Sequence, residues 1–127
     1  MTKFYVASKT HHAKLWQSIR QDYNIISTWI DEAGPNETGN MQELWTRILN
    51  EVKACDVLVF YIGSADYLLK GAFVEVGMAL ALDKQVRVVL GNGVELDSGY
   101  RPVGSWVNHL NVTIFKDFKH AFNVALT

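Results

Sequence analysis

The sequence has little that would tie it to a membrane, a disulfide framework or a nucleic-acid backbone. Its single cysteine, Cys55, cannot form an internal disulfide. Its apolar stretches fall far short of the roughly 20 residues that a membrane-spanning helix needs, which excludes a membrane protein. Twelve Lys and Arg against thirteen Asp and Glu leave a formal charge of −1, whereas a nucleic-acid partner requires a basic surface. No secretion signal is recognisable at the N-terminus, so we expect a cytoplasmic protein.

Metal and cofactor motifs are also missing. No Cys and His residues have the spacing of a structural zinc site. His11 and His12 are adjacent and so cannot share one face of a helix, and we predict no metal site. No dinucleotide or P-loop glycine pattern follows the first expected strand, and no cofactor is predicted. The third expected strand ends at residues 60–63 without an aspartate, which excludes a phospho-receiver domain.

What the sequence does have is an alternation of strand and helix patterns. The expected strands are Phe4–Ala7, Ile25–Ile30, Val57–Ile62, Val86–Leu90 and Val112–Phe115. The clearest helix begins after Asn40, which with Glu43 resembles a reciprocal capping box. It has one apolar stripe, made of Met41, Leu44, Trp45, Ile48, Leu49 and Val52. The alternation predicts one α/β domain over residues 1–127: three α/β/α layers around a five-stranded parallel sheet of flavodoxin-like order 2-1-3-4-5. A ligand is expected beyond the carboxyl ends of strands one and three, where the winding direction reverses.

Glu75 departs from its surroundings. It is the only charged residue of the segment 72–82, in which every other residue is apolar or glycine. A helix that is apolar all round is internal, and a carboxylate there is costly unless it is paired or faces a cavity. Glu75 also lies in the first turn after the third strand, close to the expected crevice. We therefore predict a functional carboxylate; the alternative is a structural one, bonded to backbone amides or to Lys70.

The segment around Glu75 carries a family resemblance. Gly71-Ala72-Phe73-Val74-Glu75-Val76-Gly77 and the helix after it resemble the G-x-x-x-E-x-G segment of the nucleoside 2-deoxyribosyltransferase family, which includes the deoxynucleoside 5′-monophosphate N-hydrolases. Tyr5-Val6-Ala7-Ser8 resembles the family's first strand, and Ala54-Cys55-Asp56 resembles the start of its third. The resemblance covers about residues 3 to 90. It implies that Glu75 is the nucleophile of N-glycosidic bond cleavage, through a glycosyl-enzyme intermediate, and that Tyr5 positions it.

Other expected substrate-binding residues lie around the same crevice. Ser8, Lys9 and Thr10 follow the first strand and are placed to meet a sugar hydroxyl or a phosphate; a plain polar turn is the alternative. Trp29 either stacks on a nucleobase or is a buried strand residue. Gly71 belongs to the matched motif.

The sequence departs from the family at two positions. Where the family commonly carries acids that bind the sugar and protonate the leaving base, this chain has Ile48 and Leu69. Base departure then needs another proton donor. The substitutes that the fold would place near the crevice are Asp66, in the loop 63–70, and Asp31, at the end of the second strand. A solvated loop acid is the alternative for each.

These observations predict an enzyme that cleaves or transfers the N-glycosidic bond of a nucleoside, a deoxynucleoside or its 5′-monophosphate. The sequence does not separate transfer from hydrolysis. A non-catalytic module that binds a nucleotide-like ligand, and a structural interaction domain, are the alternatives. An apolar set in the C-terminal third offers either a homo-oligomer contact or local core, and comprises Tyr100, Trp106, Val107 and Leu110.

Overall fold

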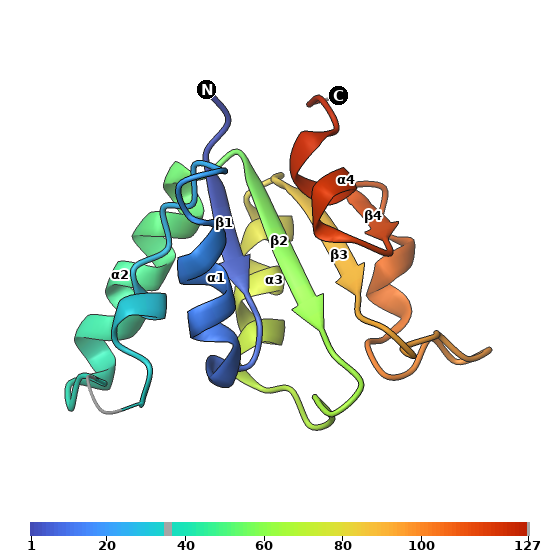
Figure 1. The fold of residues 1–127 in the computed structure, drawn as a ribbon, viewed down its shortest axis with the longest axis horizontal. Helices are drawn as coiled ribbons and strands as arrows, with labels where there is room; N and C mark the ends of the chain where they lie inside the picture. The colour runs from blue at the N-terminus through green and yellow to red at the C-terminus, as the bar shows by residue number, and fades with distance from the viewer. Residues whose placement is uncertain (35–36, 127) are drawn as a thin grey trace.

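The computed structural model describes residues 1–34 and 37–126; the expected domain also includes residues 35–36 and 127, which lie outside the described residues. Its sheet has four parallel strands in the order β1-β2-β3-β4: β1 (Phe4–Ala7), β2 (Val57–Ile62), β3 (Gln85–Leu90) and β4 (Val112–Phe115). The α-helices are α1 (Ala13–Ile19), α2 (Met41–Ala54), α3 (Gly71–Ala81) and α4 (Phe118–Asn123). Short 3-10 turns are η1 (Thr10–His12), η2 (Trp29–Asp31) and η4 (Ser105–Asn108). Figure 1 shows the arrangement.

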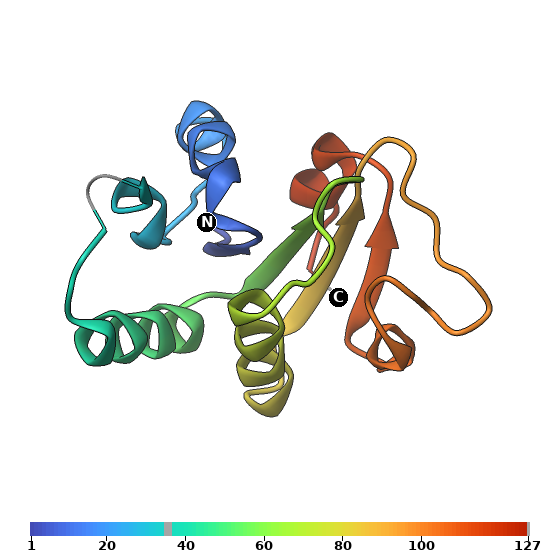
Figure 2. The ribbon, with the colours of Figure 1, turned by 90° about the horizontal axis from the view of Figure 1, so that it is seen from below.

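Helices cover both faces of the sheet. Figure 2 shows α1 and α4 on one face and α2 and α3 on the other. Because successive strand residues point to opposite faces, Phe4 packs edge-on against Phe122 of α4, with ring centroids 4.8 Å apart, while Tyr5 reaches α3 on the other side. The β2 strand is buried almost throughout, as its unbroken apolar run predicts.

The prediction of a strand at Ile25–Ile30 is wrong, and the described residues therefore form a four-stranded sheet instead of the expected five-stranded one. Only the first residue of this segment forms a bridge, parallel to Phe4 at the free edge of β1. After Ile25, side chains instead of main-chain groups form the hydrogen bonds to β1. Ser27 Oγ accepts a hydrogen bond from Val6 N at 2.7 Å, and Trp29 Nε1 donates to Val6 O at 2.8 Å. With both groups of Val6 satisfied in this way, the ladder ends.

Of the predicted capping box of α2, the Asn40 half is confirmed and the Glu43 half is not. Asn40 Oδ1 accepts from Glu43 N at 3.0 Å, which satisfies a free amide of the first turn. The Glu43 carboxylate does not return to Asn40 but pairs with Arg47, whose Nε lies 3.0 Å away. The helix is therefore capped by one side chain rather than by a reciprocal pair.

The apolar set of the C-terminal third divides between core and surface. Val107 is buried, and Trp106 packs against Phe60 with ring centroids 5.8 Å apart. Tyr100 and Leu110 are exposed. Half of this set is thus local core, and a homo-oligomer stays a prediction. Among residues 1–34 and 37–126, no helix combines the length and apolar character needed to span a membrane.

Candidate functional site

A cavity of about 420 Å³ opens beyond the carboxyl end of β1. Its walls come from the turn after β1, the N-terminal half of α2 and the start of α3, which all lie at the lower end of the sheet in Figure 1. This is the end of the strands at which a ligand is expected in an open parallel sheet. The residues that line the cavity are Ser8, Lys9, Thr10, Trp29, Glu37, Met41, Leu44, Trp45, Ile48, Leu68, Leu69, Lys70, Gly71, Ala72 and Glu75.

Glu75 is the buried carboxylate of this cavity. Its side chain comes from α3, and the residue is only 6% exposed. Its Oε1 accepts a hydrogen bond from the hydroxyl of Tyr5, a fully buried residue of β1. A Cβ at Gly71 would lie 3.9 Å from Oε2 and 3.5 Å from the Trp45 ring, so the glycine keeps the space in front of Oε2 open. One carboxylate oxygen is therefore bonded to Tyr5, while the other lies next to Gly71 in the lining of the cavity.

Burial dominates the ionisation of this pair. It raises the pKa of Glu75 to about 7; the Tyr5 hydrogen bond opposes this rise, and the negative charge of Glu51 adds to it. The pKa of Tyr5 is well above its usual value because of burial and the neighbouring Glu75 charge. Tyr5 thus stays a hydrogen-bond donor over the physiological range, and Glu75 changes its charge near neutral pH.

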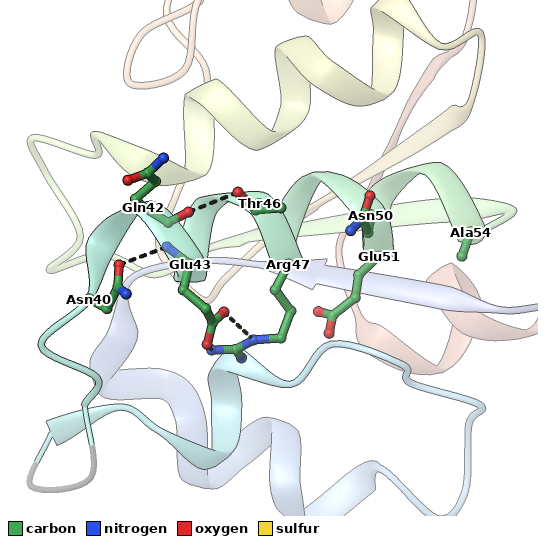
Figure 3. Close-up of a pocket in the computed structure, with 8 residues that line it drawn as sticks. All are labelled: Asn40, Gln42, Glu43, Thr46, Arg47, Asn50, Glu51 and Ala54. Atoms are coloured by element: carbon green, nitrogen blue, oxygen red, sulfur yellow. Dashed lines mark hydrogen bonds and ion pairs between the residues drawn. The ribbon is translucent and has the colours of Figure 1, made fainter.

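A larger hollow, of about 600 Å³, lies along the solvent side of α2 (Figure 3). Apart from the capping Asn40, all its lining residues belong to that single helix. Its principal charged groups are paired with each other or with the framework: Arg47 binds Glu43 and Glu32, and Glu51 accepts from Thr28. The smaller cavity is the better candidate site, because several elements converge there on a buried carboxylate.

No protein-family model and no curated protein matches the chain. Solved structures do match it. A 2-deoxyribosyltransferase from Bacillus psychrosaccharolyticus aligns over 97% of this chain and 92% of its own, with a TM-score of 0.69 and 18% identity. A 2-deoxyribosyltransferase from Leishmania mexicana covers 96% and 95%, with a TM-score of 0.61 and 16% identity. A CMP N-glycosidase from Clostridium botulinum covers 89% and 87%, at 0.56 and 14%.

The chain has the fold of the 2-deoxyribosyltransferases. On this fold, most of the residues predicted from sequence lie together. Six of them line the cavity, namely Ser8, Lys9, Thr10, Trp29, Gly71 and Glu75, while Tyr5 lies beneath Glu75.

Two of the predicted residues also belong to the frame of the cavity. Ser8 Oγ accepts from Trp16 Nε1 at 2.8 Å and donates to Lys9 O at 2.9 Å. Trp29 is 7% exposed and holds β1 through its indole nitrogen. Both side chains have fixed hydrogen-bond partners, so they shape the wall rather than reach freely for a ligand.

The two substitute acids do not line the cavity. Asp31 is half exposed and pairs with Arg20, with Nη2 and Oδ1 2.9 Å apart. Asp66 is buried, accepts from Gly63 N at 2.7 Å and lies beside His12. Ile48 and Leu69 do line the cavity. The wall is therefore apolar where the 2-deoxyribosyltransferase resemblance implies acids.

Three lining residues with charged or aromatic side chains were not predicted as substrate-binding residues. Glu37 lies in a loop that showed no chemical pattern, and Lys70 was considered only as a partner for Glu75. Trp45 belongs to the apolar stripe of α2, which was interpreted as core. The signal for Trp45 was present, but a stripe that faces a cavity has the same spacing as one that faces the core.

Proposed function

We propose that this protein cleaves or transfers the N-glycosidic bond of a nucleoside or nucleotide, with Glu75 as the nucleophile. The observation that carries the proposal is a buried carboxylate in the wall of a 420 Å³ cavity, with one oxygen bonded to Tyr5 and the other next to Gly71. The neighbouring folds add support, because the proteins that share them are named for deoxyribosyl transfer and CMP N-glycosidic cleavage.

The chemistry follows from the placement of Glu75. Its carboxylate attacks C1′ of the sugar, the C1′–N bond breaks, and the electron pair leaves with the base, which takes up a proton. Water or a second base then attacks C1′ and releases the carboxylate. The Tyr5 hydroxyl fixes the direction of Glu75 by bonding to Oε1.

The mouth of the cavity provides the other charges that a substrate would meet. Lys9 and Lys70 line it, and neither has an ion pair among the described residues, so both are available for a substrate phosphate. Glu37 is the other acid that lines the cavity within the described ranges, and it is exposed. We assign it, or solvent, the protonation of the departing base.

A second candidate function is binding of a nucleotide-like ligand without catalysis. The apolar side chains of Ile48 and Leu69 in the cavity wall favour it, because they cannot hold sugar hydroxyls or donate a proton. Glu75 favours the enzyme, since a buried carboxylate is not needed to hold an anionic or neutral ligand.

Incubation of the protein with a panel of nucleosides, deoxynucleosides and their 5′-monophosphates separates these functions. We expect free base to appear with at least one substrate, measured by chromatography, and exchange of the base when a second base is added would identify transfer. Saturable binding by calorimetry without base release would establish the binding module instead. Absence of both would contradict the proposal.

Tyr5→Phe tests the positioning role. The substitution removes the hydrogen bond that lowers the pKa of Glu75, so this pKa should rise above about 7. Because the nucleophile acts as the carboxylate, the rising limb of kcat/KM against pH should move to higher pH. Loss of a hydrogen bond to a charged group predicts a roughly 10- to 100-fold lower rate at neutral pH.

The matched control is Tyr23→Phe, because Tyr23 stacks on Phe122 on the opposite face of the sheet. It should leave the pH profile in place. If the rising limb of kcat/KM against pH were unchanged in Tyr5→Phe, Tyr5 would have no role in the mechanism and would be a core residue only.

A further inference from the structure

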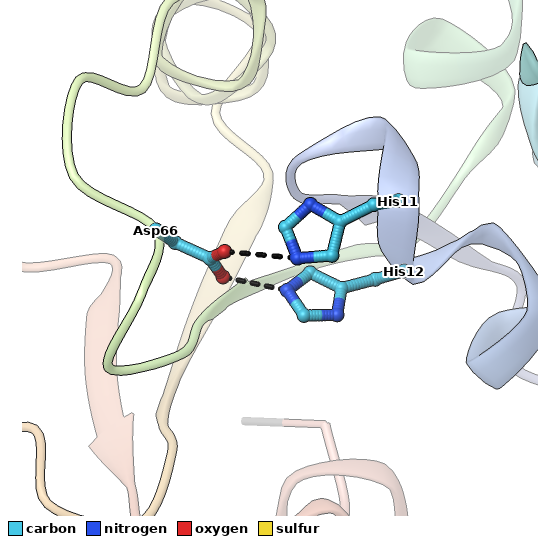
Figure 4. Close-up of side chains that lie close together, drawn as sticks. All are labelled: His11, His12 and Asp66. Carbon is cyan, nitrogen blue, oxygen red and sulfur yellow. Dashed lines mark hydrogen bonds and ion pairs between the residues drawn. The ribbon is translucent and has the colours of Figure 1, made fainter.

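His11, His12 and Asp66 form a cluster that the proposed chemistry does not use. Adjacent histidines are not expected to share a helix face, but η1 is a tight 3-10 turn and both rings point to one carboxylate (Figure 4). His12 Nε2 lies 2.6 Å from Asp66 Oδ2, and His11 Nε2 lies 3.2 Å from Oδ1. The expectation that the two rings cannot share one face is therefore wrong for this turn.

The carboxylate of Asp66 is buried yet incompletely satisfied. The residue is 1% exposed, and Oδ2 accepts from Gly63 N and contacts His12. Among the described residues, Oδ1 has no hydrogen-bond partner, although it points toward His11. A buried carboxylate oxygen without a partner is costly, and a cation between it and the imidazoles would satisfy it.

We propose that His11, His12 and Asp66 bind a divalent first-row transition-metal ion. One ligand atom from each residue fits within a span of 4.8 Å. Metal–ligand bonds of about 2.0–2.2 Å place ligand atoms roughly 3–3.5 Å apart. The His12–Asp66 pair, now 2.6 Å apart, would therefore open slightly around the ion, and the exposed His11 ring would rotate to complete the set. Two imidazoles and one carboxylate suit zinc or iron(II), and three protein ligands leave coordination positions open.

The position of the cluster gives the ion a structural consequence. Thr10 precedes the two histidines in η1, and Leu68 follows Asp66 in its loop; both line the Glu75 cavity. An ion held by η1 and this loop would join two walls of that cavity. The site does not depend on the glycosidic chemistry, because Asp66 and both histidines lie outside the cavity lining.

Titration of the metal-free full-length protein with Zn²⁺ by calorimetry, and with Co²⁺ by visible absorption, tests the proposal. We expect one ion per chain and a rise in Tm with Zn²⁺, because an ion that binds only the folded state stabilises it. His11→Ala and Asp66→Asn should each weaken binding at least about tenfold. His11 has a side chain that is 59% exposed, so its loss tests the site even where Asp66→Asn fails to fold.

The matched control is His120→Ala. His120 also faces an aspartate, with Nδ1 2.7 Å from Asp117 Oδ2, but that pair lies at the surface and is not part of a three-ligand cluster of the described residues. Its removal should leave the affinity unchanged. No binding, binding that His11→Ala leaves intact, or binding that His120→Ala abolishes would each overturn the proposal.

Discussion

Glu75→Gln is expected to lower base release from the preferred substrate by about 10³-fold or more, with little change in KM. The amide keeps the size of the side chain and an oxygen that can accept from Tyr5, so the cavity should keep its shape. It cannot act as a nucleophile, and removal of a nucleophile typically costs several orders of magnitude in kcat. The measurement is the initial rate of free-base formation by chromatography.

A covalent intermediate gives a second readout. Wild-type protein quenched with substrate should gain the mass of the sugar, or the sugar phosphate, on the peptide that contains Glu75. The matched control is Glu43→Gln, which makes the same change at an exposed pair with Arg47 on α2. It should retain full rate and adduct. Base release by Glu75→Gln at the wild-type rate would refute the assignment of the nucleophile.

The regular elements of the fold were predictable because their apolar spacing is set by burial. The strand β2 was placed correctly from its unbroken apolar run, and the helix α2 from an apolar period of 3.6 residues. The prediction of a strand over residues 25–30 failed because β-branched and aromatic residues indicate burial but do not by themselves indicate pairing with another strand. Whether Ser27 and Trp29 would replace the ladder with side-chain hydrogen bonds depends on their position beside Val6, which no local pattern contains.

Glu75 was predictable because a charge inside an apolar helix violates a strong rule. The roles of Asp31 and Asp66 were not predictable, because they depend on which residues each acid contacts in the folded chain. Asp66 meets His12, 54 residues earlier in the chain, and only the parallel pairing of β1 and β2 brings the following loops together. Sequence reasoning could place these residues at the correct end of the sheet but could not choose their contacts.

Glu75→Gln should also stabilise the protein at neutral and alkaline pH. The pKa of Glu75 is about 7 in the folded chain, above the value of 4.5 expected for an exposed glutamate. The folded state therefore holds the proton more tightly, and the free energy of unfolding of the wild type falls as the pH rises from about 4.5 to 7. At pH 8 the variant, free of this penalty, should be more stable by roughly 3 kcal/mol. The two proteins should differ little at pH 4.

Thermal or urea unfolding at pH 4, 6 and 8 measures this difference, with an expected gain in Tm of roughly 10 °C at pH 8. Glu43→Gln again serves as the control, and its expected change in stability at neutral pH has the opposite sign. The hydrogen bond from Arg47 lowers the pKa of Glu43, so that variant should lose a little stability at neutral pH and recover it at acid pH; the effect is small because the pair is exposed. If the stability difference between Glu75→Gln and the wild type did not change with pH, the ionised Glu75 would already be stabilised by its surroundings, and the expected penalty would be absent. A buried carboxylate kept at the expense of stability is what a catalytic role predicts, because a purely structural residue would gain from the amide.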